Sequence, residues 1–215
     1  MSGVLFDLDG TLVDTSIDMV LALQSLAKEN GIGIEADFVK YRELITYGSR
    51  ALVTSIFGEI DKNELSRLQK RYLEIYENCL TQNTILFDGM KEVIQYLDSN
   101  QISWGIVTNK PVFLAQPLVE NMPELQNCKV LVGGGMTEYA KPHPQPILLA
   151  IEKSQIKPEY SWYIGDALTD IQAGRSAGMK SAGALWGYIS ETDNPNLWSA
   201  DKLLNHPTEI LNLFK

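Results

Sequence analysis

The sequence is poor in cysteine and lacks long apolar runs. Only two of its 215 residues are cysteines, Cys79 and Cys128, and they lie far apart with no Cys-x-x-Cys arrangement. This scarcity favours two reduced, buried thiols in a cytosolic protein over a disulfide framework. No apolar run approaches membrane-spanning length, and the N-terminus enters an apolar strand without a basic leader. We therefore expect a cytoplasmic protein that is neither secreted nor inserted in a membrane.

Positive charge is scarce as well. Only 18 lysines and arginines stand against 27 aspartates and glutamates, so the formal net charge is −9. Such a chain would repel the phosphates of a nucleic acid, and we expect no nucleic-acid partner. A small anionic ligand is still compatible, because a site can be locally positive. The two histidines, His143 and His206, have no partners at metal-ligand spacing, and we assign them no chemistry.

The chain does contain a regular alternation of strand and helix patterns. With 45% apolar and 21% charged residues, it can bury a core and hold one domain plus an insertion. Apolar runs predict strands at residues 4–6, 103–107, 130–132, 161–164 and 181–185. Helical patterns separate the later strands. This alternation predicts an α/β fold with a doubly wound parallel sheet.

A block of helical patterns interrupts this alternation after the first strand. Apolar residues recur at helical spacing near 16–30, 37–44, 49–57 and 61–79, and no strand pattern occurs among them. We therefore expect a core formed by residues 1–14 and 85–215, with an inserted all-helical domain at 15–84.

Paired acids follow two of the predicted strands. Asp7 and Asp9 come directly after the first strand, and Asp166 and Asp170 follow the strand at 161–164. The carboxyl ends of parallel strands form the edge at which open α/β sheets bind ligands. Carboxylates as close together as these repel each other, so we expect a cation to hold them. Mg²⁺ is the natural candidate, because it prefers oxygen ligands. A turn or a helix cap would explain each acid alone, but not the repetition at two strand ends.

Two further polar positions lie near the ends of strands. Thr108 and Asn109 follow the strand at 103–107, where a hydroxyl and backbone N–H groups could hold a phosphoryl oxygen. A helix cap before Pro111 is the alternative interpretation of Thr108. Lys141 precedes a proline, which favours an extended backbone, and its ammonium could neutralise a carboxylate and a transferring phosphoryl group. A solvated surface lysine is the alternative there.

Taken in order, these segments resemble the haloacid dehalogenase-like (HAD) hydrolase superfamily over nearly the whole chain. The first is Asp-x-Asp-Gly-Thr after an apolar strand, and Thr108, Lys141 and the Gly-Asp pair ending at Asp166 follow. The resemblance implies a HAD-like Rossmannoid core in which Asp7 is the nucleophile that forms an aspartyl-phosphate. It implies that Asp9 is the general acid–base. Dehalogenases of this superfamily lack that second acid, so dehalogenation is disfavoured.

The resemblance also assigns roles to the remaining polar residues. Thr108, Asn109 and Lys141 would bind the phosphoryl group, with Thr108 and Lys141 counted among the catalytic residues. The Asp7 carboxylate, the Asp9 backbone carbonyl and Asp166 would hold Mg²⁺. Asp170 would support the metal or orient Lys141.

Residues 15–84 match the position of the superfamily's type-one cap, which selects the leaving group. Within this cap we expect Gly48, Ser49 and Arg50 to face the substrate. Arg50 can offer a fork of donors to a carboxylate or a sugar oxygen. A glycine turn followed by a solvated arginine is the alternative.

Within the superfamily the chain resembles the phosphoglycolate phosphatase-type group. More narrowly, residues 86–90, 104–111, 187–189 and 193–196 are similar to bacterial N-acetylmuramic acid 6-phosphate phosphatases. This implies an enzyme of carbohydrate metabolism that acts on a small phosphorylated metabolite, as a monomer or homodimer. A β-phosphoglucomutase-like mutase and an inorganic pyrophosphatase on the same core stay open. A non-enzymatic protein on this fold should have lost at least one motif acid, and none is lost here.

Overall fold

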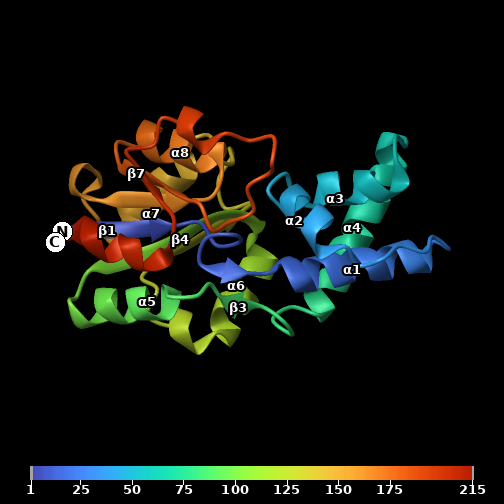
Figure 1. Ribbon diagram of the computed structural model, residues 1–215, viewed down its shortest axis with the longest axis horizontal. Coiled ribbons are helices and arrows are strands. Elements are labelled where there is room, and N and C mark those ends of the chain that lie inside the picture. The colour runs from blue at the N-terminus through green and yellow to red at the C-terminus, as the bar shows by residue number, and fades with distance from the viewer. Residues whose placement is uncertain (1, 215) are drawn as a thin grey trace. The chain divides into compact units, whose positions relative to one another are not determined.

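The chain forms two compact units, which Figure 1 draws as ribbons. The computed structural model describes residues 2–214. One unit comprises Met1–Val13 and Leu86–Lys215, and the other comprises Asp14–Ile85. These junctions differ by one residue from those expected from the sequence. The chain passes between the units through β2 (Val13–Asp14) and β3 (Ile85–Leu86), which pair as a two-stranded sheet.

The larger unit is built on a parallel sheet of six described strands. In spatial order they are β5 (Leu131–Gly134), β4 (Ser103–Pro111), β1 (Gly3–Phe6), β6 (Trp162–Gly165), β7 (Lys180–Ala184) and β8 (Lys202–Leu204). The sequence predicted the first five of these strands, and most of the predicted ends lie within a few residues of the observed ones. It did not predict β8, because three residues are too short to show a strand period.

Helices cover both faces of this sheet, as Figure 1 shows. The helices α5 (Met90–Ser99) and α6 (Val112–Asn121) lie on one face, and α7 (Gln145–Ser154) and α8 (Leu168–Ser176) lie on the other. Short 3₁₀ helices complete the unit at η1 (Pro123–Leu125), η2 (Pro158–Tyr160), η3 (Pro195–Leu197) and η4 (Pro207–Phe214). Parallel strands joined by helical crossovers give the doubly wound α/β fold that the sequence predicted.

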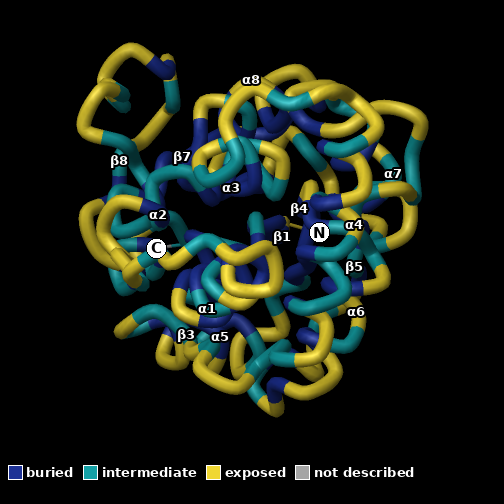
Figure 2. Tube along the Cα trace, turned by 90° about the vertical axis from the view of Figure 1, so that its right-hand side faces the viewer, coloured by how far each residue is buried: buried dark blue, intermediate teal, exposed yellow. Residues whose placement is uncertain are grey.

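The core of the larger unit surrounds β1. All four residues of this strand are buried, and it pairs with β4 on one side and β6 on the other. Figure 2 shows the dark blue of buried residues around the labels of β1 and β4. On one face Leu5, Val107 and Tyr163 pack in the same cluster as Ile147 of α7 and Ala173 of α8. This packing brings the carboxyl ends of β1, β4 and β6 to one edge of the sheet.

The smaller unit is helical, as the sequence predicted. Its described helices are α1 (Ser16–Glu29), α2 (Phe38–Ile45), α3 (Gly48–Phe57) and α4 (Lys62–Asn78). The carboxylates of Asp37 and Asp61 cap α2 and α4 by accepting backbone N–H groups. The buried hydroxyl of Tyr72 donates to the Met19 carbonyl oxygen at 3.2 Å, which ties α4 to α1.

The cysteines are free thiols, one in each unit. Both side chains are partly exposed, so the prediction of reduced thiols was confirmed and the prediction that they are buried was wrong. Desolvation raises the pKa of Cys128 to about 11, so this thiol stays protonated at neutral pH. Among residues 2–214, no helix is long and apolar enough to cross a membrane.

Candidate active site

Asp7 and Asp9 lie on a tight loop that follows β1. The amides of residues 11–13 all donate to the Leu8 carbonyl oxygen, at 3.0–3.4 Å. Gly10 has a φ of +82°, and a Cβ atom there would fall 2.1 Å from Asp166 Oδ2, so the loop requires glycine. Because the strand ends at Phe6, the two acids do not continue its alternation, and they contact different lysines.

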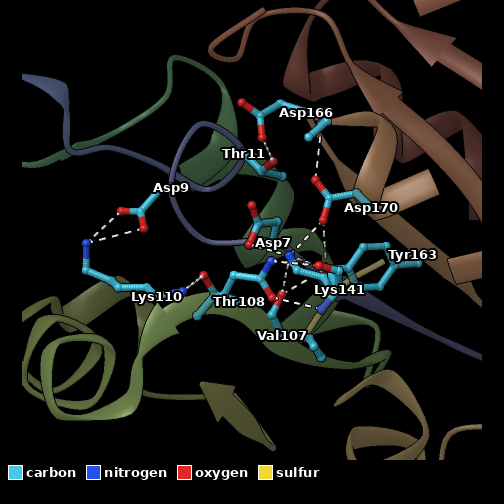
Figure 3. Close-up of polar contacts among 12 residues, drawn as sticks. Asp7, Asp9, Thr11, Val107, Thr108, Lys110, Lys141, Tyr163, Asp166 and Asp170 are labelled. Carbon is cyan, nitrogen blue, oxygen red and sulfur yellow. Dashed lines mark hydrogen bonds and ion pairs between the residues drawn. The ribbon is translucent and has the colours of Figure 1, made fainter. Parts of the chain in front are cut away.

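Lys141 is the centre of the buried polar network in Figure 3. Its Nζ lies 2.8 Å from Asp7 Oδ1 and 2.7 Å from Asp170 Oδ1, and it also contacts the Tyr163 hydroxyl at 2.9 Å and the Val107 carbonyl oxygen at 3.0 Å. Desolvation would lower the pKa of this lysine, but Asp170 and Asp7 raise it well above the ordinary value. The ammonium is therefore charged, and its partners offset the cost of burying it.

Asn109 fixes the backbone of Lys141. Its Nδ2 donates to the Lys141 carbonyl oxygen at 3.0 Å, and the Lys141 N–H donates back to Asn109 Oδ1 at 3.0 Å. The strand β4 continues to Pro111, beyond the end predicted at residue 107. Thr108 and Lys110 are buried, whereas Asn109 between them is exposed, as strand alternation requires. The Thr108 hydroxyl accepts from the Lys110 N–H at 3.1 Å, and α6 has no side-chain cap, so the helix-cap interpretation of Thr108 was wrong.

Three carboxylates converge beside Lys141. Asp7, Asp166 and Asp170 each offer an oxygen within 4.8 Å of the others. The Tyr188 N–H donates to Asp166 Oδ2 at 2.7 Å, which orients that side chain. Desolvation raises the pKa of Asp7 to about 6, against the lowering effect of Lys141. Desolvation and then Asp7 raise the pKa of Asp166 well above its ordinary value. A cluster of carboxylates whose pKa values are raised in this way would be stabilised by a positive charge. Its oxygen atoms are the donors that a hard divalent cation prefers.

The Asp9 carboxylate is not one of these three. Its two oxygens lie 3.0 and 3.3 Å from Lys110 Nζ, and both side chains are largely buried. The metal role expected for Asp9 concerned its backbone carbonyl oxygen, and it stays a proposal. The sequence patterns did not indicate Lys110 or Tyr163. Strand alternation from Thr108 would have pointed to Lys110, and a hydroxyl within an apolar strand would have pointed to Tyr163.

The other expected substrate residues, Gly48, Ser49 and Arg50, belong to the smaller unit. They form the first turn of α3, which Gly48 enters with a φ of +79°. Ser49 Oγ accepts a hydrogen bond from Gln69 Nε2 of α4 at 2.9 Å, and Arg50 is exposed. The binding role expected for this turn stays a proposal.

Comparisons with known proteins agree with the resemblance found in the motifs. Residues 4–184 match the family model described as haloacid dehalogenase-like hydrolase. The chain is 35% identical over 214 residues to the N-acetylmuramic acid 6-phosphate phosphatase of Pseudomonas aeruginosa, covering 99% of this chain and 94% of that protein. It is 38% identical over 207 residues to a phosphoglycolate phosphatase of Xanthomonas campestris pv. campestris, covering 96% and 93%.

The fold has close counterparts among solved structures. The crystal structure of a predicted phosphoglycolate phosphatase from Haemophilus somnus 129pt superposes with a TM-score of 0.87 at 24% identity, covering 100% of this chain and 98% of that one. The match covers the whole length of the chain and therefore both units of the fold. By sequence and by fold, this chain belongs to the haloacid dehalogenase-like hydrolase family.

Proposed function

We propose that this protein is a Mg²⁺-dependent phosphatase that moves the phosphoryl group of a small metabolite onto Asp7 and then to water. The family match and the phosphatase-named relatives make the chain a phosphoric monoester hydrolase. The observation that carries the mechanism is the position of one charged lysine between Asp7 and Asp170, beside a cluster of three carboxylates. That arrangement supplies a nucleophile, a phosphoryl-binding cation and a set of metal ligands in one place.

Asp7 acts as the nucleophile in this proposal. One of its oxygens accepts a hydrogen bond from Lys141, and the other attacks phosphorus. The bond from phosphorus to the leaving oxygen breaks as the aspartyl-phosphate forms, and Asp9 gives a proton to that oxygen. Asp9 then takes a proton from water, which attacks phosphorus and releases phosphate and Asp7.

The surrounding residues hold the transferring group. The Thr108 hydroxyl, the backbone at Asn109 and the Lys141 ammonium bind phosphoryl oxygens, while the Asn109 side chain fixes the Lys141 backbone. Asp7, Asp166 and the Asp9 backbone carbonyl would hold Mg²⁺, which would neutralise charge on the phosphoryl group when bound. Asp170 holds Lys141 in place and is the third carboxylate of the cluster.

The leading substrates are N-acetylmuramic acid 6-phosphate and phosphoglycolate. Two relatives named as phosphatases of these compounds are 35% and 38% identical to this chain over nearly its whole length. Both compounds carry a carboxylate besides the phosphate. We propose that the smaller unit acts as the cap that selects the leaving group, through Gly48, Ser49 and Arg50.

A panel of phosphorylated metabolites assayed for phosphate release in Mg²⁺ tests this function. We expect release from a carboxylated phosphomonoester, and less than about one hundredth of that rate with folded Asp7→Asn, because an amide is a poor nucleophile. Faster release from pyrophosphate than from any monoester would support an inorganic pyrophosphatase. An isomerised sugar phosphate without free phosphate would support a mutase. No turnover of any compound in the panel would reject the proposal.

A further inference from the structure

Lys110 is a buried lysine to which the mechanism above gives no role. Its side chain is only 4% exposed, and its Nζ lies within 3.3 Å of both oxygens of Asp9, which is itself 16% exposed. Burying an ammonium is unfavourable unless a partner of opposite charge compensates it. A lysine at this depth is therefore not explained as a solvated surface charge.

The position of the Asp9 backbone is already determined by its loop. The Gly10 N–H donates to the Val13 carbonyl oxygen at 3.0 Å, and Asp9 and Val13 form a β-bridge. The Leu8 carbonyl oxygen accepts from the amides of residues 11–13. These bonds fix the main chain, but they leave the side-chain torsions of Asp9 undetermined. Lys110 contacts both carboxylate oxygens, so it fixes the plane of the carboxyl group.

Lys110 is itself held in place by β4. Its N–H donates to the Thr108 hydroxyl at 3.1 Å, and this stretch of β4 lies between Val107 and Pro111, which both pair with β5. A Cβ atom on Gly134 of β5 would lie 3.3 Å from the Lys110 carbonyl oxygen, so the two strands approach closely there. A side chain carried by a strand that packs this closely against its neighbour is positioned more precisely than one on a free loop.

The two acids of the first motif thus have separate cations. Lys141 contacts Asp7, and Lys110 contacts Asp9 (Figure 3). We infer that Lys110 is a positioning residue that holds the carboxyl group of Asp9 in the orientation for proton transfer to the leaving oxygen. This inference rests on the proposed phosphatase function, because it needs Asp9 to act as the acid.

Proton transfer to the leaving oxygen matters most when the alcohol that departs is a poor leaving group. An alkyl phosphate such as phosphoglycolate must release an alkoxide unless a proton arrives as the bond to phosphorus breaks. The p-nitrophenolate of p-nitrophenyl phosphate leaves without a proton. Since kcat/KM reports only the steps up to formation of the aspartyl-phosphate, it isolates this first transfer from the later attack by water.

The test compares kcat/KM of wild type and Lys110→Met on both classes of substrate, using p-nitrophenyl phosphate and the alkyl phosphate with the highest wild-type activity in the panel. General acid catalysis contributes about 10²–10⁴-fold, so a misplaced Asp9 should lose at least about 30-fold on the alkyl phosphate. The loss on p-nitrophenyl phosphate should stay below about threefold. Lys110→Arg, which keeps a cation, should recover part of the alkyl phosphate activity.

The control is Lys91→Met, which removes an exposed lysine that pairs with Glu124 at 3.2 Å in the same unit. It should leave both activities unchanged. Circular dichroism and thermal melting establish that each variant is folded, and Lys110→Gln replaces Lys110→Met if the latter does not fold. Equal losses on both substrates, no loss on either, or a gain on the alkyl phosphate would each overturn the inference while leaving the phosphatase function standing. Wild-type inactivity on the whole panel would instead reject the proposed function, and this inference with it.

Discussion

The hydroxyl of Tyr163 accepts a hydrogen bond from Lys141 Nζ at 2.9 Å and donates one to the Val107 carbonyl oxygen at 2.8 Å. Tyr163 lies in β6 and Val107 lies in β4, the two strands that flank β1. The phenol therefore links both neighbours of the strand that carries Asp7. It is fully buried, and its pKa is raised well above the ordinary value, mainly by desolvation, so it stays protonated and can donate.

Tyr163→Phe removes this hydroxyl and little else. Lys141 and the Val107 carbonyl oxygen each lose one partner, and a buried polar group left short of a partner costs about 1–3 kcal/mol. We expect the melting temperature to fall by about 2–10 °C. We also expect kcat to fall several-fold with a smaller change in KM, because Lys141 becomes less well oriented. The matched control is Tyr160→Phe, which changes an exposed tyrosine just before the same strand. Wild-type stability and kcat in Tyr163→Phe would refute this role.

Turnover should require Mg²⁺ and stop in excess chelator. In the part of the chain that the structure describes, the three carboxylates of Asp7, Asp166 and Asp170 lie beside only one lysine, Lys141, so a further cation is needed to neutralise their negative charge. Calcium should bind, and raise the melting temperature, yet support little turnover. It accepts more ligands at longer distances, so it can engage both oxygens of Asp7 and spoil the geometry of attack. The measurements are phosphate release and thermal melting in chelator, Mg²⁺ and Ca²⁺. Full activity in calcium or in chelator would contradict the proposal.

The metal-free protein should become less stable as pH rises past the ordinary pKa of aspartate. Desolvation raises the pKa of Asp7 from 3.8 to about 6, so folding takes up a proton between these values. The stabilising contribution of the protonated carboxyl is therefore present below about pH 4 and is lost as pH rises through about 6.

Asp7→Asn is the probe for this effect, because its amide cannot ionise. In chelator, the melting temperature of Asp7→Asn minus that of wild type should increase by a few degrees between about pH 4 and pH 7. Saturating Mg²⁺ should reduce the difference at pH 7 by stabilising only the carboxylate. A difference that is constant or that decreases with pH would show that folding does not raise the pKa of Asp7.

Arg50→Ala tests the proposal that Arg50 of the smaller unit binds the carboxylate of the substrate. Arg50 is exposed in this structure, so the proposal requires that bound substrate buries the arginine–carboxylate contact. Truncating one partner of such a buried contact costs about 2–5 kcal/mol, so kcat/KM should fall by at least about tenfold for the preferred carboxylated substrate. Activity on p-nitrophenyl phosphate, which has no carboxylate, should hardly change. Arg67→Ala is the control, since Arg67 is an exposed arginine of the same unit that pairs with Glu64. Equal losses on both substrates would assign Arg50 to the fold, and no loss on either would leave it a solvated side chain.

The sequence by itself determined the class of fold and pointed to the four acids Asp7, Asp9, Asp166 and Asp170. Apolar runs that end in Asp7 and Asp166 mark strand ends, and the carboxyl ends of parallel strands meet at one edge. This local pattern was enough to predict five of the six strands described in the parallel sheet, and the helical insertion. The strand β8 was missed because a segment of three residues pairs only where β7 is already present to receive it.

The tertiary structure alone decided which cation meets which acid. Lys141 and Asp7 are 134 positions apart, and Lys110 and Asp9 are 101 positions apart, so no local spacing relates them. The order of the strands in the sheet brings them together, and that order depends on how the crossover helices pack. The same is true of Tyr163, whose phenol looks like an ordinary core aromatic in the sequence. Only the packing of β6 beside β1 turns it into a support for Lys141, because a buried hydroxyl must find its partners wherever the fold places them.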